Sequence, residues 1–161
     1  MFSGKSTELI KRVDRLRQAN QRCLLVNHVL DSRTGNFVKT HDDITLEAVK
    51  TDDLATLNIK HFDVILIDEG QFFKNLKTEI EKMLQKNKIV LVAGLKGDFN
   101  MNKFGEMIDL VPIADNIIYL QANCYNCGEK ASFTKRLSSE EQVVSVNSSY
   151  APSCRKCHSI P

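Results

Sequence analysis

The chain has 161 residues, of which 42% are hydrophobic and 26% are charged, a composition ordinary for a soluble globular protein. This length is enough for one hydrophobic core and a small appended unit. The net charge of +2 is too small to indicate a nucleic-acid-binding surface by itself. No apolar run approaches the roughly 18 residues of a membrane span, and no signal-peptide pattern opens the chain. We therefore expect no membrane partner.

The chain opens with a glycine-lysine-serine-threonine run at residues 4–7. Backbone N–H groups of such a loop, the dipole of the following helix and one lysine can bind a polyphosphate. A serine hydroxyl can also hold the magnesium ion that bridges the phosphates. The alternative interpretation is a plain helix N-terminus with a lysine in its first turn. The expected phosphate-binding residues are Met1, Phe2, Ser3, Gly4, Lys5, Ser6 and Thr7, with Ser6 also a magnesium ligand.

A phosphate-binding loop normally follows a strand and has a first glycine five residues before the second. The printed sequence has neither feature before Gly4. We therefore expect roughly ten further residues upstream, enough to carry this first strand.

The first half of the chain predicts a helix and a buried strand. Apolar residues recur at helical spacing over residues 6–19, which leaves the arginines of this segment on a solvated face. The apolar run at 23–26 is typical of a buried strand. Residues 31–43 lack periodicity and indicate a loop, and residues 46–57 predict a short helix.

Residues 64–67 are four consecutive hydrophobic residues of a kind common in strands, and Asp68 and Glu69 follow them directly. Such a run is typical of a strand buried on both faces of a parallel sheet. An acidic strand end paired with a phosphate-binding loop indicates a magnesium site, with Asp68 as a ligand. Further along, the sequence predicts a helix at 76–84, a two-sided strand at 89–93 and another strand at 117–120.

The alternation of strands and helices predicts an α/β fold over residues 1–121, in which a parallel sheet is flanked by helices. The amino-acid composition changes near residue 122, because four of the five cysteines lie beyond this point. We expect residues 122–161 to form a smaller unit, with a β-hairpin over 133–137 and 143–146 and a polar loop that reaches Tyr150.

The cysteines of this smaller unit form two Cys-x-x-Cys pairs, separated by 26 residues. Two such pairs supply four thiolates for a tetrahedral, structural zinc ion. Two disulfides are the alternative, but a nucleotide-phosphate site belongs in a reducing compartment, so we expect zinc and a cytoplasmic location. His158 follows the last cysteine and is interpreted as a surface residue. The expected zinc ligands are Cys124, Cys127, Cys154 and Cys157.

Several strings resemble type II thymidine kinases, the cytosolic, zinc-containing kind also encoded by large DNA viruses. They are Met-Phe-Ser-Gly-Lys-Ser-Thr-Glu-Leu at 1–9, Asp-Glu-Gly-Gln-Phe-Phe at 68–73, Thr-Lys-Arg-Leu at 134–137 and both cysteine pairs. The resemblance covers residues 1–157. It implies phosphorylation of thymidine to its 5′-monophosphate in DNA precursor salvage, with ATP as donor, Mg²⁺, structural Zn²⁺, a zinc-pinned lid and a homotetramer.

The resemblance also implies roles for matching residues. Glu69 would take the proton from the 5′-hydroxyl of the nucleoside. The residues implied at the ATP and phosphoryl-transfer site are Asp31, Arg33, Asp68 and Gln71. Those implied around the nucleoside are Leu95, Phe99, Phe104, Thr134, Val143, Val144, Ser145, Val146, Asn147 and Tyr150.

A different interpretation is a nucleic-acid-binding ATPase whose zinc unit grips a strand. Arginines are not gathered in the zinc segment, and its aromatic residues Tyr125, Phe133 and Tyr150 are sparse for stacking platforms. We therefore expect thymidine and ATP as partners and no nucleic acid.

Overall fold

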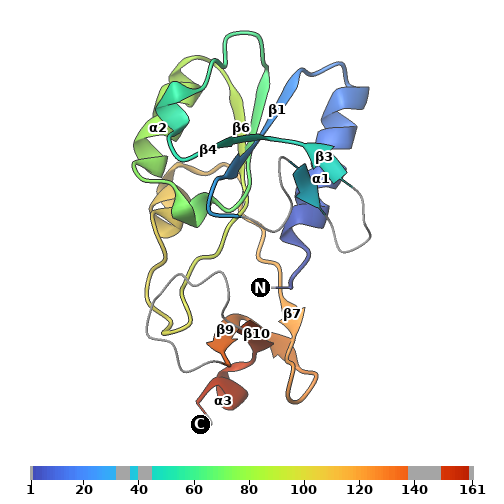
Figure 1. Ribbon diagram of the computed structural model, residues 1–161, viewed down its shortest axis with the longest axis vertical. Coiled ribbons are helices and arrows are strands. Elements are labelled where there is room, and N and C mark those ends of the chain that lie inside the picture. The colour runs from blue at the N-terminus through green and yellow to red at the C-terminus, as the bar shows by residue number, and fades with distance from the viewer. Residues whose placement is uncertain (1, 32–36, 40–44, 138–149, 160–161) are drawn as a thin grey trace.

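The computed structural model describes residues 2–31, 37–39, 45–137 and 150–159. Its centre is a four-stranded parallel sheet in the order β4-β1-β5-β6 (Figure 1). Helices α1 and α2 lie on opposite faces of this sheet, so the predicted α/β fold is confirmed. The elements are α1 (Lys5–Gln18), β1 (Cys23–His28), β4 (Val49–Thr51), β5 (Val64–Ile67), α2 (Leu76–Gln85) and β6 (Ile89–Val92).

Strand β5 supplies side chains to both hydrophobic cores. Ile65 and Ile67 pack into the core on the α2 face, whereas Val64 and Leu66 pack into the core on the α1 face. Successive side chains of a strand point to opposite faces, which explains why all four are fully buried. Burial of each such side chain contributes about 1.5–3 kcal/mol before the entropic cost of ordering the chain. The predicted two-sided strand is confirmed.

The two predicted helices also form at the expected places. Helix α1 begins after Gly4, whose φ of 77° is left-handed and is readily adopted by glycine. Its buried face is Leu9, Ile10 and Val13, while α2 covers the opposite face of the sheet. Among the described residues, no helix has both the length and the apolar character that crossing a membrane requires.

The helix predicted at residues 46–57 is wrong. Strand β3 (Thr45–Glu47) and strand β4 occupy this stretch, and only a short 3₁₀ turn, η2 (Leu54–Thr56), follows them. Strand β4 pairs in parallel with the end of β1, and this tertiary pairing overrides the weak local preference for helix. Strand β2 (Phe37–Lys39) pairs antiparallel with β3, so part of the expected loop at 31–43 is also a strand.

The strand predicted at residues 117–120 is wrong too, because these residues form no strand. Ile117, Ile118, Tyr119 and Leu120 are instead large exposed hydrophobic residues. Strand β6 forms as predicted, but its side chains are only partly covered or exposed. In the described part of the chain β6 pairs with β5 on one edge, and no strand pairs with its other edge. A β-rich run becomes a strand only where a neighbour pairs its backbone.

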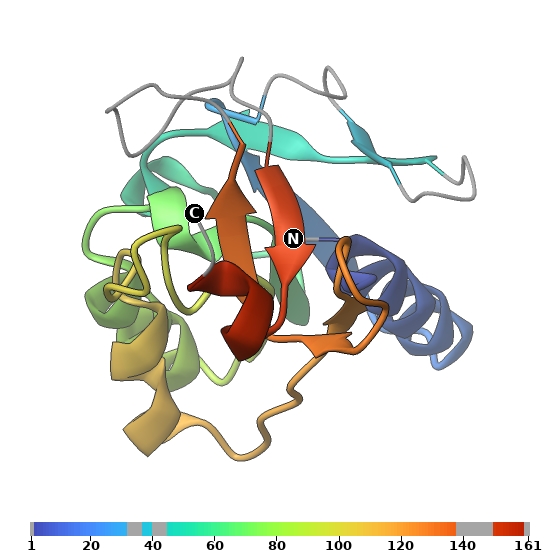
Figure 2. The same ribbon diagram turned by 90° about the horizontal axis from the view of Figure 1, so that it is seen from below.

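The cysteine-rich segment forms a separate small unit below the sheet (Figure 1). Its core is a cluster of Ala122, Cys124, Ala131 and Cys157. Seen from below, β9, β10 and α3 lie in front of the parallel sheet (Figure 2). The predicted strand at 133–137 is present as β9, and its described partner is β10; residues 143–146 lie outside the described residues. The elements are β7 (Ala122–Asn123), β8 (Lys130–Ala131), β9 (Phe133–Arg136), β10 (Tyr150–Ser153) and α3 (Arg155–His158).

Candidate functional site

The first turn of α1 meets the carboxyl end of β5. The Ser6 hydroxyl donates a hydrogen bond to Asp68 Oδ2 at 3.0 Å, although the two residues are 62 positions apart. The positive charge of Lys5 also acts on Asp68. The structure therefore brings together the glycine-lysine-serine loop and the acidic strand end. This contact favours a phosphate and metal site over a plain helix N-terminus. Met1 lies outside the described residues.

Asp68 is a buried carboxylate with defined partners. Its side chain is only 2% exposed, and Oδ1 accepts a hydrogen bond from the N–H of Glu69 at 2.9 Å. Burial, followed by the negative charge of Glu69, raises the pKa of Asp68 to about 6, against the opposing effects of Lys5 and Ser6. A bound cation would relieve this electrostatic cost. Carboxylate and hydroxyl oxygens are the ligands that Mg²⁺ prefers, so Asp68 and Ser6 fit that ion.

Glu69 is turned out of the strand direction by its backbone. Its φ of 53° is left-handed, a conformation uncommon outside glycine and frequent at functional sites. The Gln71 amide donates to Glu69 Oε2 at 2.5 Å and accepts from the N–H of Leu95 at 2.9 Å. Gln71 is 3% exposed. These contacts favour a positioning role for Gln71 over the expected phosphate contact.

Asp31 joins the same edge of the sheet from the segment after β1. Its side chain is 7% exposed, and Asn27 Nδ2 donates to Asp31 Oδ2 at 3.0 Å. Asn27 Oδ1 accepts from the N–H of His28 at 2.8 Å, and the Lys50 ammonium group donates to the Asp31 main-chain carbonyl. Asn27, fully buried, was not among the predicted site residues. A polar residue near the carboxyl end of an apolar strand is the signal that could have identified it. Arg33 lies outside the described residues.

The residues expected around the nucleoside come from both units. Phe99, in the segment after β6, lies 6.5 Å from Tyr150 of β10 between ring centroids. The Arg136 guanidinium lies 3.9 Å from the Phe99 ring centroid and donates to the Tyr150 hydroxyl at 2.5 Å. Thr134 is buried in β9. Phe104 packs edge-on against Phe72 at 5.6 Å, and Val143, Val144, Ser145, Val146 and Asn147 lie outside the described residues.

The four predicted zinc ligands converge on one point. Their sulfur atoms all lie within 4.8 Å of one another, and the sulfurs of Cys127 and Cys154 are 3.7 Å apart. Zn–S bonds of about 2.3 Å place the sulfurs of a tetrahedral site about 3.8 Å apart. All five cysteines of the chain are described and are free thiols, which disfavours the disulfide alternative. Asn126 donates to Cys157 Sγ at 3.4 Å.

The thiols of this cluster titrate very differently. Backbone hydrogen bonds, the largest from Cys154, lower the pKa of Cys124 to about 6. The N–H of Glu129 lowers the pKa of Cys127, but burial and hydrogen bonds with the neighbouring sulfurs outweigh it and raise that pKa to about 12. Four adjacent thiolates therefore need a cation among them, as a zinc ion provides.

His158 is not the surface residue that the sequence predicted. It is half-buried, and its Nε2 lies 3.0 Å from the Phe99 carbonyl and 3.2 Å from the Thr134 carbonyl. The prediction was wrong because sequence spacing cannot show which residue packs between two units.

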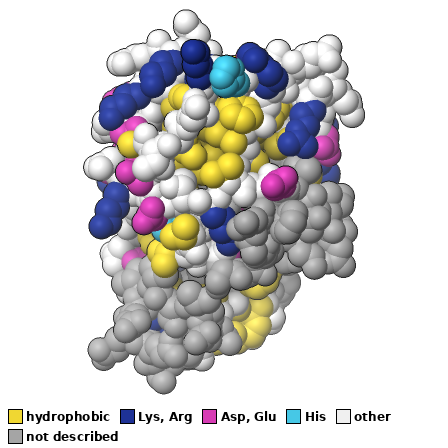
Figure 3. Space-filling model, turned by 45° about the horizontal axis from the view of Figure 1, so that its top comes forward, with side chains coloured by type: hydrophobic (Ala, Val, Ile, Leu, Met, Phe, Trp, Pro, Cys, Tyr) yellow, Lys and Arg dark blue, Asp and Glu magenta, His cyan; other side chains and the backbone are white. Residues whose placement is uncertain are grey.

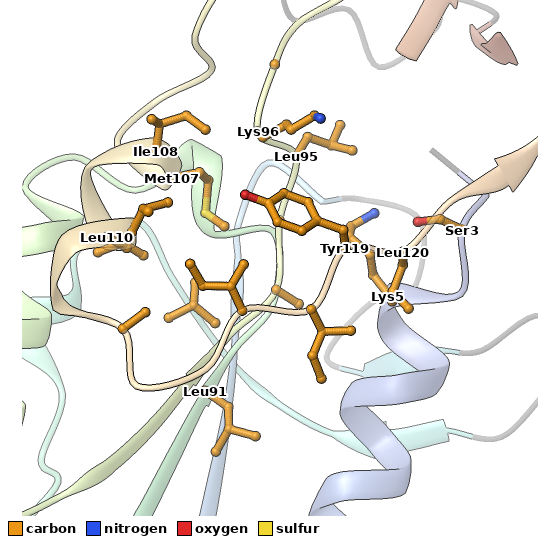
Figure 4. Close-up of a pocket in the computed structure, with 18 of the residues that line it drawn as sticks. Ser3, Lys5, Leu91, Leu95, Lys96, Met107, Ile108, Leu110, Tyr119 and Leu120 are labelled. Atoms are coloured by element: carbon orange, nitrogen blue, oxygen red, sulfur yellow. The ribbon is translucent and has the colours of Figure 1, made fainter. Parts of the chain in front are cut away.

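A large groove of about 960 Å³ lies beside the open edge of β6. We call it the β6 groove. Its walls include β6 and residues 117–121, and it reaches Ser3 and Lys5 at the start of α1. Figure 4 shows Tyr119 extending across this groove, and Leu120 and Lys5 are also among its lining residues. The hydrophobic residues at 117–120, which do not form the predicted strand, therefore line a groove whose walls also include Ser3 and Lys5.

Comparison with known proteins gives a consistent result. A sequence model of the family described as thymidine kinase matches residues 1–158. The thymidine kinase of Myxoma virus (strain Uriarra) is 43% identical over 98% of this chain and 91% of its own length. That of Rabbit fibroma virus (strain Kasza) is 41% identical, with coverage of 98% and 91%. That of Vaccinia virus (strain Ankara) is 40% identical, with coverage of 98% and 92%.

Replacement of Asp68 by Asn should stabilise the ligand-free protein at pH 7.5. The raised pKa means that the folded state disfavours the ionised carboxyl, so wild-type stability falls as pH rises through the interval from about 4 to about 6. The gain in Asp68→Asn should therefore shrink below pH 6 and disappear near pH 4. Urea midpoints across this range would measure it.

Asp63→Asn is the matched control with the opposite sign. Hydrogen bonds from Arg22 hold the pKa of Asp63 well below its usual range, so that carboxylate stabilises the fold at neutral pH. Asp63→Asn should lower the urea midpoint. Destabilisation by Asp68→Asn at pH 7.5 would contradict the assigned electrostatic cost.

The cysteine cluster should hold about one zinc per chain. Cys154→Ser should lose the metal and loosen the small unit, whereas Cys23→Ser, in strand β1 away from the cluster, should keep it. Metal analysis after dialysis measures both. Metal-free wild-type protein with two disulfides, purified under reducing conditions, would rule out the zinc site.

Proposed function

This chain belongs to the thymidine kinase family, and we propose that it transfers the γ-phosphoryl group of ATP to the 5′-hydroxyl of thymidine. The reaction would depend on Mg²⁺ and serve salvage of DNA precursors. We further propose that residues 1–121 bind ATP and that residues 122–161 form a zinc-pinned lid over the nucleoside. Enclosure suits this chemistry, because water competes with the sugar hydroxyl for the phosphoryl group.

The contact between Ser6 and Asp68 is the observation that best supports this proposal. It joins the loop that can bind phosphates to the strand end that carries two buried carboxyl groups. Phosphoryl transfer is governed by positioning and by neutralisation of charge. Lys5 would neutralise the phosphates, and Asp68 with Ser6 would hold the magnesium ion, which supplies further charge neutralisation when bound.

Glu69 is suited to orient and deprotonate the attacking hydroxyl. Its carboxylate is held by the Gln71 amide, and Gln71 is held in turn by the N–H of Leu95. A general base needs a fixed position within hydrogen-bond reach of the proton that it removes. Because the backbone turns at Glu69, its carboxylate points in a different direction from that of Asp68.

The nucleoside would lie between the two units. Phe99 from the larger unit and Tyr150 from the smaller unit are held around the Arg136 guanidinium. Aromatic faces of this kind can stack on a pyrimidine ring. Leu95 is joined through Gln71 to Glu69, which would link the base-binding side of the site to its catalytic side.

The alternative of a nucleic-acid-driven ATPase has weaker support. In the view of Figure 3, Lys and Arg side chains lie around a central group of hydrophobic side chains, with Asp and Glu side chains among them. The described part of this face therefore lacks the uniform positive charge that tracks a nucleic-acid backbone. An assay with ATP, Mg²⁺ and labelled thymidine, with and without DNA, separates the two functions. A motor would hydrolyse ATP when given DNA and would form no thymidine monophosphate.

Glu69→Gln should lower turnover by roughly 10²- to 10⁴-fold, the usual contribution of a general base, while ATP binding stays close to wild type. Glu79→Gln is the matched control, because Glu79 is also buried but pairs with Lys82 within α2. Single-turnover kinetics would measure the chemical step. A Glu69→Gln enzyme with more than about a third of wild-type turnover would exclude the assignment.

We also propose that the β6 groove receives an extended, apolar segment that leads into Phe2 and adds a strand parallel to β6. Three features support this. The outer edge of β6 has no strand partner among the described residues, the groove exposes apolar side chains, and its lining includes Ser3 and Lys5. Phosphate-binding loops are built as strand, loop and helix, and such a strand would fix the loop from its amino side.

An extension of about eight residues before Met1, made of a β-rich run, a glycine and one further residue, should tighten ATP binding at least about tenfold. A glycine-serine extension of equal length is the control. Calorimetric titration of ATP into both variants measures the difference. Equal affinities would mean that the groove does not position the loop through an added strand.

A further inference from the structure

The His158 ring joins three segments that are distant in the sequence. Its Nε2 lies within hydrogen-bond distance of the carbonyl oxygens of Phe99 and Thr134, at 3.0 and 3.2 Å. A carbonyl oxygen can only accept a hydrogen bond. Nε2 must therefore carry the hydrogen and donate to both carbonyls. Helix α3 is thus tied to the segment after β6 and to strand β9 through one imidazole.

The main chain of His158 is fixed by the cysteine cluster. Its N–H donates to the Cys154 carbonyl at 2.9 Å, and the N–H of Cys157 lies 3.4 Å from Cys154 Sγ. His158 also lies edge-on to the Phe133 ring at 5.9 Å. The turn that carries two of the expected zinc ligands therefore sets the position of the imidazole.

The two carbonyls that the imidazole binds belong to the expected nucleoside site. Phe99 contributes its ring to the arrangement with Arg136 and Tyr150, and Thr134 is buried in β9. The smaller unit therefore holds Phe99 twice. Arg136 stacks on its ring, and His158 binds its main chain. A ring held at both places has little freedom to move out of the site.

We propose that His158 is a positioning residue through which the cysteine cluster holds the aromatic wall of the nucleoside site. This inference rests on the proposed function of that site. Without the imidazole N–H, both carbonyls lose this donor, and among the described residues of the smaller unit the contacts that remain with Phe99 are those made to its ring. The free protein would then have to order this segment when the nucleoside binds, which weakens binding.

Comparison of His158→Ala, His158→Gln and the exposed-site control His61→Ala tests the proposal. His158→Ala should raise the Kd and KM for thymidine roughly fivefold to thirtyfold, the range for loss of a hydrogen bond in a partly buried site. We expect kcat to fall less than about threefold, and ATP affinity and zinc content to stay at wild-type values. His158→Gln should recover most of the affinity, because its side-chain amide can donate at a similar reach. His61→Ala should match wild type.

Amide hydrogen exchange in residues 97–104 gives a readout that does not depend on the substrate. Exchange should be faster in His158→Ala than in His61→Ala. Unchanged exchange and unchanged thymidine affinity in a zinc-loaded His158→Ala protein would overturn the proposal, and so would an equal loss of ATP binding and zinc. A wild-type protein that binds no thymidine, with exchange still faster in His158→Ala, would reject the proposed function and keep the positioning role.

Discussion

The parallel pairing of β1 with β5 is the constraint on which the rest of the molecule depends. Residues from Cys23 to Val26 pair with Val64 to Ile67, and the N–H of Asp68 continues the ladder to the Val26 carbonyl at 2.8 Å. Parallel strands end at the same edge of a sheet, so Asn27 and Asp68 emerge together. Side chains that are far apart in the sequence thereby reach the same edge, and α1 places Ser6 against Asp68.

The same edge concentrates unfavourable charge. Asp68 and Glu69 are adjacent, buried and of the same sign, and Glu69 has a left-handed backbone. Neutral amides of Asn27 and Gln71 each hold one nearby carboxylate in place. Two buried carboxylates destabilise the fold when no cation is bound, and a bound cation would remove that destabilisation. Such arrangements are typical of functional sites, where some folding stability is given up for binding. The surrounding hydrophobic cores make this cost tolerable.

The smaller unit depends on a different kind of interaction. Its described core consists of two alanines and cysteines, too little apolar surface for an independent fold, and small units of this kind usually require a metal or disulfides. A zinc ion held by four thiolates would replace the missing core and fix α3 and β10. Arg136, Tyr150 and His158 reach from this unit to Phe99. The zinc-pinned unit would therefore contact a nucleoside at the boundary between the two units.

Local sequence was sufficient for α1, β1, β5, α2 and the cysteine cluster, because helical periodicity, continuous β-rich runs and ligand spacing are properties of short segments. It also predicted that Ser6 and Asp68 share one site, and the structure joins them by a hydrogen bond. The role of Glu69 rests on the family resemblance and stays a prediction. It failed at residues 46–57 and 117–120, where strand or coil was decided by the presence or absence of a pairing neighbour. Asn27 and His158 were missed for a related reason, since an amide and an imidazole acquire a role only from what lies opposite them. The sequence by itself determined the two long helices, the buried strands β1 and β5 and the convergence of the four cysteines. Only the tertiary structure decided which backbones pair and which polar side chains meet, because these depend on contacts between residues far apart in the chain.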